Sequence, residues 1–194
     1  QDVCSSDLIR AERRKVVESG IVLRRLPGID ATHADWAFFK RCYDHTYRAH
    51  YATPYLNLDF FLRIGESMPN NILLVIAERD GKPIASSLLI HDRQALYGRY
   101  WGAVEHHPCL HFETSYYQPL EFCIEQKIAA FEGGAQGEHK MARGFLPKTT
   151  WSAHWLAHAD FTDAVERFLV REGEGISAYV DELNDRNPFR ASYR

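Results

Sequence analysis

The dipeptide Asp80-Gly81 separates two apolar runs and constrains the fold of this chain more than any other feature. Residues 72–77 and 84–90 are both rich in branched apolar side chains. Asp-Gly between two such runs favours a tight hairpin turn, because both residues tolerate the positive φ that the turn requires. The patterns of residues 95–101 and 110–114 predict a third and a fourth strand. The middle of the chain is therefore predicted to be an antiparallel meander.

Helical periodicity precedes this meander. Residues 21–23 are a short predicted strand, and a helix is expected over residues 33–50, with Asp30 or Thr32 as its cap. A second helix is expected after Asn57, which suits an N-cap, and it closes near Pro69. The aromatic side chains of the first helix fall on one face and are predicted to be core.

Helical periodicity also follows the meander. Pro119 suits the first turn of a central helix, and residues 149–155 predict another strand. Asp160 is expected to cap a last helix that is interrupted near Gly173 and Gly175. The predicted buried stripe of the central helix is Leu120, Ile124, Ile128 and Phe131. That of the last helix is Phe161, Val165, Phe168 and Leu169.

Composition excludes several classes of protein. The chain has 194 residues, and its hydrophobic content of 45% suffices for a substantial core. A formal net charge of −3 does not favour a globally basic nucleic-acid binder. No apolar run has transmembrane length. Cys4, Cys42, Cys109 and Cys123 show no paired spacing, which indicates reduced thiols in a cytoplasmic protein. Residues 1–9 are expected to be a non-native or disordered leader, and residues 10–194 a single lobe.

Several segments resemble a known bacterial family. They are YGRYWG (97–102), LHFETSYYQ (110–118), residues 124–155 with GAQGEHK and RGF, and Pro188-Phe189. Together they are similar to the FemAB-like family of peptidoglycan biosynthesis/recognition proteins, placed in the Gcn5-related acyltransferase (GNAT) superfamily. The resemblance covers residues 11–190. It implies an α+β fold with a central, mostly antiparallel sheet flanked by helices. It also implies that the chain is the C-terminal lobe of a two-lobed protein whose N-terminal lobe is missing here.

The resemblance implies an acyl- or aminoacyltransferase that forms an amide bond. The related Fem ligases move an aminoacyl group from a charged tRNA to an amine on a peptidoglycan precursor. The expected partners are therefore an acyl donor, with aminoacyl-tRNA or acyl-CoA as the possible donors, and an amine acceptor; no cofactor is implied. Two alternatives stay open, an acetyl-CoA-dependent N-acetyltransferase and a non-catalytic module that recognises a cell-wall peptide. Acetyl-CoA is disfavoured because residues 113–118, assigned to the pyrophosphate-binding junction, contain no glycine.

The first candidate site follows the central helix, where glycines and charged side chains are concentrated. Glycine lets the backbone approach a ligand, and nearby carboxylate, imidazole and ammonium groups suit proton transfer and charge stabilisation. The alternative is an ordinary solvated loop. The candidates are Gln136 and Gly137 with Arg143 for substrate binding, and Glu138, His139 and Lys140 for catalysis. Lys140 best matches the lysine that Fem-type proteins place at the substrate site.

The second candidate site lies on the predicted third and fourth strands. On a strand over residues 110–114, His111 and Glu113 would share one face and form a proton relay. A buried structural pair is an equal alternative. The residues expected to bind substrate here are Arg99, Tyr100, Trp101 and Tyr117.

Side chains that can bind zinc are close together in residues 106–111, namely His106, His107, Cys109 and His111. Zinc requires three or four convergent ligands, and the spacing of these residues matches no common ligand pattern. No metal is predicted.

Overall fold

The computed structural model describes residues 5–134 and 138–185, which belong to two compact units. One unit is Ile9–Ala135, and the other joins Gln1–Leu8 to Gln136–Arg194. Among the described residues, no helix is long and apolar enough to cross a membrane.

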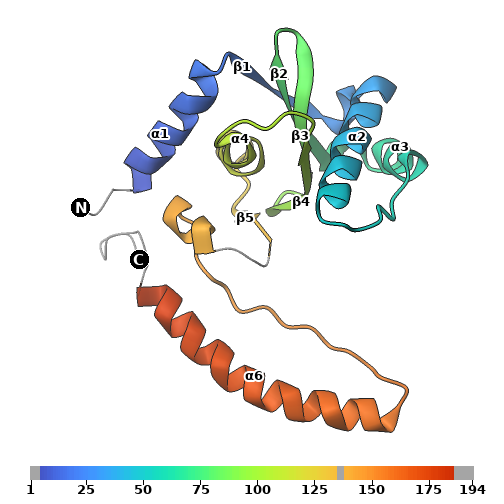
Figure 1. The fold of residues 1–194 in the computed structure, drawn as a ribbon, viewed down its shortest axis with the longest axis vertical. Coiled ribbons are helices and arrows are strands. Elements are labelled where there is room, and N and C mark those ends of the chain that lie inside the picture. Colours follow the sequence, from blue (N-terminus) through green and yellow to red (C-terminus); the bar gives the residue numbers. More distant parts are fainter. Residues whose placement is uncertain (1–4, 135–137, 186–194) are drawn as a thin grey trace. The chain divides into compact units, whose positions relative to one another are not determined.

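The unit Ile9–Ala135 is built on one five-stranded sheet (Figure 1). Its strands lie in chain order, and each neighbouring pair is antiparallel except β4 and β5, which are parallel. The strands are β1 (Ile21–Pro27), β2 (Ile72–Arg79), β3 (Lys82–His91), β4 (Ala95–Ala103) and β5 (Ala130–Glu132). The predicted hairpin is confirmed: Asp80 and Gly81 connect β2 to β3 with φ values of 51° and 71°.

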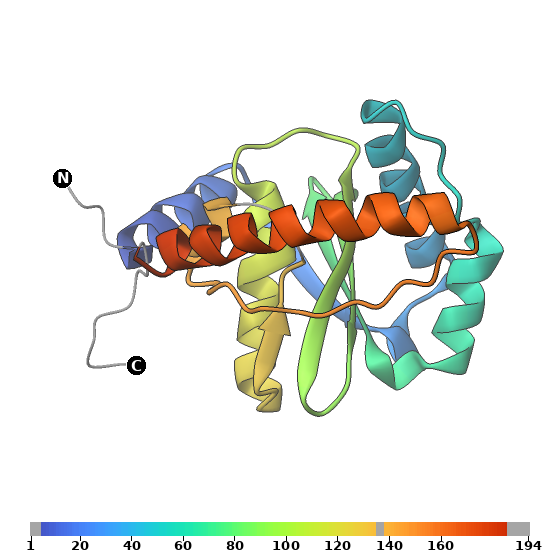
Figure 2. The ribbon, with the colours of Figure 1, turned by 90° about the horizontal axis from the view of Figure 1, so that it is seen from below.

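Two helices cover one face of the sheet, α2 (His33–Ala49) and α3 (Leu58–Ser67) (Figure 2). Thr32 caps α2, because its hydroxyl accepts from the N–H of Asp35 while the Asp35 carboxylate accepts from the N–H of Thr32. Asn57 caps α3 as predicted. The core on this face combines aromatic side chains of the helices with branched side chains of the strands: Trp36, Phe39, Tyr43, Phe61, Leu74, Ile76 and Leu88.

The opposite face is covered by α1 (Ser5–Glu18), through its residue Val16, and by a helical segment that spans residues 110–126. That segment consists of α4 (Leu110–Phe112), a π-helical turn η3 (Glu113–Tyr117) and α5 (Gln118–Gln126). Pro119 has no N–H, and in an α-helix its ring would clash with the carbonyl of Ser115. The wider π turn immediately before Pro119 lets the helix continue through the proline.

The prediction of a fourth strand over residues 110–114 is therefore wrong. The alternation there is only five residues long, too short to distinguish a strand from a buried helix. Cys109 starts the helix in the left-handed region, with φ 65°, and the Thr114 hydroxyl donates to the carbonyl of Leu110 at 2.9 Å. The junction between β4 and the helix is consequently residues 104–109, and not residues 113–118.

The predicted buried stripe of the central helix is wrong for its first two members, whereas Ile128 and Phe131 lie beyond the helix end and pack against the core. Leu120 and Ile124 are 42% and 70% exposed, because the helix begins nine residues before Pro119 and buries another face. That face consists of Leu110, Tyr116, Tyr117, Pro119 and Cys123.

The second unit contains a 3₁₀ helix η4 (Glu138–Arg143) and the long helix α6 (Ala159–Asp185), shown in orange and red in Figure 1. Residues 149–155 form no strand, and Gly173 and Gly175 do not interrupt α6. The stripe predicted to face inward is exposed, with Phe161 at 66% and Phe168 at 54%. Two small elements complete the description, η1 (Gly28–Asp30) and η2 (Pro69–Asn71).

Candidate functional site

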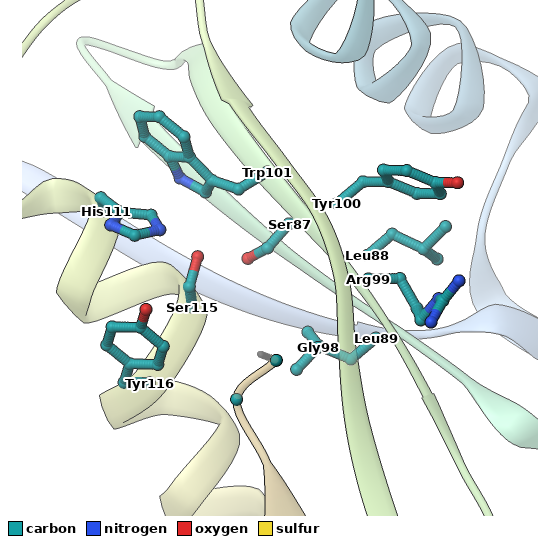
Figure 3. A pocket seen from close by; sticks show the side chains of 12 residues that line it. Ser87, Leu88, Leu89, Gly98, Arg99, Tyr100, Trp101, His111, Ser115 and Tyr116 are labelled. Carbon is teal, nitrogen blue, oxygen red and sulfur yellow. The ribbon is translucent and has the colours of Figure 1, made fainter. Parts of the chain in front are cut away.

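A cleft opens where the parallel strands β4 and β5 part. The two strands pair over only three residues, which end with Tyr97 opposite Glu132. Beyond that point β4 continues through Gly98 to Ala103, while β5 ends and is followed by Gly133 and Gly134. A cavity of about 230 Å³ lies between them. It is lined by Ser87, Leu88, Leu89, Gly98, Arg99, Tyr100, Trp101, His111, Ser115, Tyr116, Gly133 and Gly134 (Figure 3).

A β-bulge lies in the wall of this cleft. Leu88 of β3 pairs with Tyr100, whereas the next residue, Leu89, pairs with Gly98. Arg99 is the extra residue, and it has a register partner neither in β3 nor in β5. A bulge interrupts the ladder and redirects the side chain that it carries. Backbone at Arg99 is therefore available to a ligand in the cleft.

The helix of residues 110–126 forms the opposite wall. The ring of His111 lies 4.8 Å from the ring of Trp101 and 5.4 Å from that of Tyr116. The indole N–H of Trp101 donates to the Thr114 hydroxyl at 2.8 Å, which fixes the indole against the helix. In Figure 3, His111, Ser115 and Tyr116 project from the helix on the side that faces β4. The cleft thus places an imidazole beside an aromatic wall, opposite the bulge.

A second cavity, of about 390 Å³, lies at the junction of residues 104–109. Its lining is rich in imidazoles, from His45 and His50 of the α2 end and from three histidines of the junction and helix start: His106, His107 and His111. His111 and Trp101 line both cavities. Within the described residues, no group of three or more histidine, cysteine or acidic side chains has a geometry that could hold a metal ion.

Arg99 lies beside a cluster of tyrosines that includes Tyr100 and extends to Tyr55, in the loop before α3. The hydroxyls of Tyr100 and Tyr55 lie 2.7 Å apart, and the Arg99 guanidinium lies 6.0 Å from the centroid of the Tyr100 ring. Burial raises the pKa of Tyr100 to about 12. The pKa of Tyr55 is lowered, first by its hydrogen bond to Tyr100, then by that to Tyr47, with a further contribution from the charge of Arg99.

Glu113 and Tyr117 project toward α1. The carboxylate of Glu113 is buried, and it accepts from Arg13 Nη2 at 3.1 Å, from Arg13 Nε at 3.2 Å and from Gln118 Nε2 at 2.9 Å. The Tyr117 hydroxyl donates to the carboxylate of Glu12. Neither side chain lines the cleft. The expectation that His111 and Glu113 share a strand face fails, because residues two apart on a helix project in widely different directions.

The candidates after the central helix fall in the other unit. Gln136 and Gly137 lie outside the described residues, and Glu138 begins η4. Burial, and then the charges of Arg143 and Lys140, lower the pKa of His139. Burial also lowers the pKa of Lys140. Both shifts favour the neutral forms, which can accept a proton. Arg143 Nη1 donates to the carbonyl of His139 at 2.5 Å.

The residues of the cleft that sequence reasoning missed include Ser87, Ser115 and Gly98. Ser87 looked like an ordinary strand residue, and its hydroxyl donates to the carbonyl of Thr114 at 2.6 Å. Ser115 Oγ is buried, and among the described residues it has no hydrogen-bond partner. The helical spacing of His111 and Ser115 would have indicated this face, had the segment been assigned as helix.

The model of the FemAB-like family, described as peptidoglycan biosynthesis/recognition, matches residues 6–191. The chain belongs to the FemAB-like family. No curated protein matches the sequence.

Solved structures show that this FemAB-like chain has a GNAT-type fold. An aminoglycoside acetyltransferase from an uncultured soil metagenomic sample, solved with trehalose, has a TM-score of 0.51 at 8% identity, covering 73% of this chain and 99% of that one. A predicted acetyltransferase from Clostridium acetobutylicum, solved with acetyl-CoA, has a TM-score of 0.52 at 14% identity, covering 72% and 99%. A possible acetyltransferase from Clostridium difficile 630 has a TM-score of 0.51 at 9% identity, covering 71% and 99%.

Proposed function

We propose that the cleft between β4 and β5 catalyses transfer of an acyl or aminoacyl group to an amine, forming an amide. The parting of the two strands beside the bulge at Arg99 carries this proposal. A bulge leaves backbone groups outside the ladder, where an N–H can donate to the developing oxyanion of an acyl group. Family membership supports a role connected with peptidoglycan biosynthesis or recognition.

His111 is the proposed proton acceptor of this cleft. The amine nitrogen attacks the carbonyl carbon, the new C–N bond forms, and the bond to the leaving oxygen or sulfur breaks. The amine proton passes to His111 and then to the leaving group, so that no covalent enzyme intermediate is needed. Trp101 and Tyr116 on either side of the imidazole would hold its orientation.

The proposed donor is an aminoacyl-tRNA in a cytoplasmic reaction. The junction between β4 and the helix, residues 104–109, reads VEHHPC and contains no glycine. Glycine-rich junctions let backbone N–H groups surround a pyrophosphate. Following the resemblance to two-lobed relatives, we propose that an N-terminal lobe completes the donor site.

A second candidate, acetyl-CoA-dependent N-acetylation, is favoured by one observation. The chain shares its fold with a protein solved with acetyl-CoA. A third, recognition without catalysis, is compatible with the family description.

We also keep the proposal that Glu138, His139 and Lys140 act in catalysis and that Arg143 binds substrate. If Lys140 and Glu138 are catalytic, Lys140→Ala and Glu138→Gln remove activity without unfolding the protein. Full activity in both variants would exclude this catalytic role.

The deciding experiment is calorimetric titration of acetyl-CoA into the protein, expressed with and without an upstream lobe, followed by charged tRNA. Micromolar binding of acetyl-CoA in either form would replace the proposed donor. Binding of charged tRNA followed by amide formation would support aminoacyl-tRNA as the donor. Loss of amide formation in His111→Gln but not in His106→Gln would support His111 as the proton acceptor. Saturable binding of a cell-wall peptide without turnover would leave the recognition module.

A further inference from the structure

Among the described residues, the lining of the cleft contains one exposed cation and no acidic side chain. Arg99 is exposed at the bulge, and it forms no ion pair with any described carboxylate. The twelve residues that line the cleft include His111 and several hydroxyls but no aspartate or glutamate. An uncompensated guanidinium in such a lining favours an anionic group on the ligand.

The surroundings of Arg99 are suited to a small, planar anion. The ring of the adjacent Tyr100 lies 6.0 Å from the guanidinium, and its hydroxyl is hydrogen-bonded to that of Tyr55. A guanidinium donates two parallel N–H bonds to a carboxylate, and phenol hydroxyls supply further donors. Figure 3 shows Arg99 and Tyr100 on the side of β4 away from His111. The charged end and the imidazole end of the cleft are therefore separated.

We propose that the acceptor amine carries a carboxylate, and that Arg99, with the Tyr55–Tyr100 hydroxyl pair, binds this carboxylate and selects the acceptor. This inference deepens the proposed function, from which it takes the amine acceptor and the proton-accepting role of His111. Arg99 is then a specificity-determining residue: its bidentate bond fixes one end of an amino acid or peptide, while the amine at the other end reaches the imidazole. A phosphate is the competing anion, because the same fork binds it.

The test measures how tightly two probes bind to the full 194-residue chain. The probes, Nα-acetyl-lysine and Nα-acetyl-lysinamide, differ only in having a carboxylate or a neutral carboxamide. Binding is followed by the NMR shift of the Trp101 indole N–H. We expect the acid to bind about tenfold more tightly than the amide, as a charge-assisted bond implies. In Arg99→Gln this preference disappears, and in Arg99→Lys and Tyr55→Phe it shrinks. Arg93→Gln, an exposed arginine in the turn before β4, is the matched control and keeps the full preference.

Equal binding of the two probes, absence of binding by both, or loss of the preference in Arg93→Gln would each overturn the inference. Inorganic phosphate that displaces the acid at lower concentration than free acetate does would also overturn it, by assigning the anion as phosphate. Activity separates this test from that of the proposed function. A protein that prefers the acid but transfers no acyl group even when it is expressed with its upstream lobe refutes only the function. An active chain in which Arg99→Gln lowers kcat without raising KM for the acid refutes only the carboxylate site.

Discussion

At the scale of single residues, Glu113 illustrates how neighbours determine a role. Its type and its nearness to His111 suggested a proton relay, but the helix turns it toward Arg13 of α1, and the bidentate contact there explains its burial. A buried carboxylate with three donors around it is held in place and removed from any substrate. We therefore infer that Glu113 stabilises the packing of α1 on the helix.

Replacing Glu113 tests this assignment. In Glu113→Gln the Arg13 guanidinium loses its buried partner, and we expect the free energy of unfolding to fall by about 2 kcal/mol, since Arg13 is itself half-exposed. Urea denaturation measures the change. Glu121→Gln is the control, because Glu121 also contacts Arg13 but is 40% exposed, and it should cost less than about 1 kcal/mol. A Glu113→Gln protein of unchanged stability that has lost all transfer activity would restore the catalytic role.

Asp35 gives a prediction about pH. Burial alone would raise its pKa, but hydrogen bonds from Thr32 and Arg24 outweigh burial, and the net pKa is lowered below 3.8. The carboxylate therefore contributes stability that is fully present above the ordinary pKa and is lost as pH falls through the lowered one. Wild type should exceed Asp35→Asn in stability at pH 6, and the difference should narrow below about pH 4. Denaturation at pH 6 and pH 2.5 measures it; a constant difference would contradict this account.

At the scale of elements, the close contact between α2 and β4 depends on residue 102 being a glycine, which has no side chain. A Cβ on Gly102 would lie 2.0 Å from the carbonyl oxygen of Cys42, and the Thr46 hydroxyl donates to the Trp101 carbonyl at 2.9 Å. Because Trp101 and the strand around it form the cleft wall, this close approach positions the candidate site as well as the core.

Two glycine substitutions test this contact. Gly102→Ala forces α2 away from β4 and should lower the free energy of unfolding by about 3 kcal/mol. Gly173→Ala lies inside α6, where an added Cβ has nothing within 4 Å, and it should stabilise that helix by about 1 kcal/mol. Denaturation and amide hydrogen exchange report the two effects. Similar losses from both substitutions would show that close packing at Gly102 is not the cause.

At the scale of the whole molecule, the two units differ in how their apolar side chains are covered. In Ile9–Ala135 apolar side chains on both faces of the sheet form buried clusters. In the other unit, Trp151 and Trp155 are 93% and 86% exposed, and the apolar stripe of α6 is exposed as well. Stability is therefore expected to be concentrated in the unit that contains the cleft.

Limited trypsin digestion tests this difference. Lys148 is exposed, and it lies outside every described helix and strand. We expect the first cut after Lys148, leaving the fragment that contains Ile9–Ala135 resistant, because protease cleaves exposed, unstructured backbone. In Lys148→Gln this product should disappear. A first cut inside β2 or β3 would instead show that the sheet is the less stable part.

What the sequence determined by itself was every element whose signal is local. The hairpin at Asp80-Gly81, the cap at Asn57, the choice of Asp30 or Thr32 as the other cap, the first three strands of the meander and the family all follow from neighbouring residues or short motifs. Only the tertiary structure decided that residues 110–126 form one helix, that the junction is residues 104–109, and that His111 faces the cleft while Glu113 faces α1. A five-residue alternation fits a strand or a helix equally well. The choice depends on burial against residues such as Ser87 and Val16, which are far away in the chain.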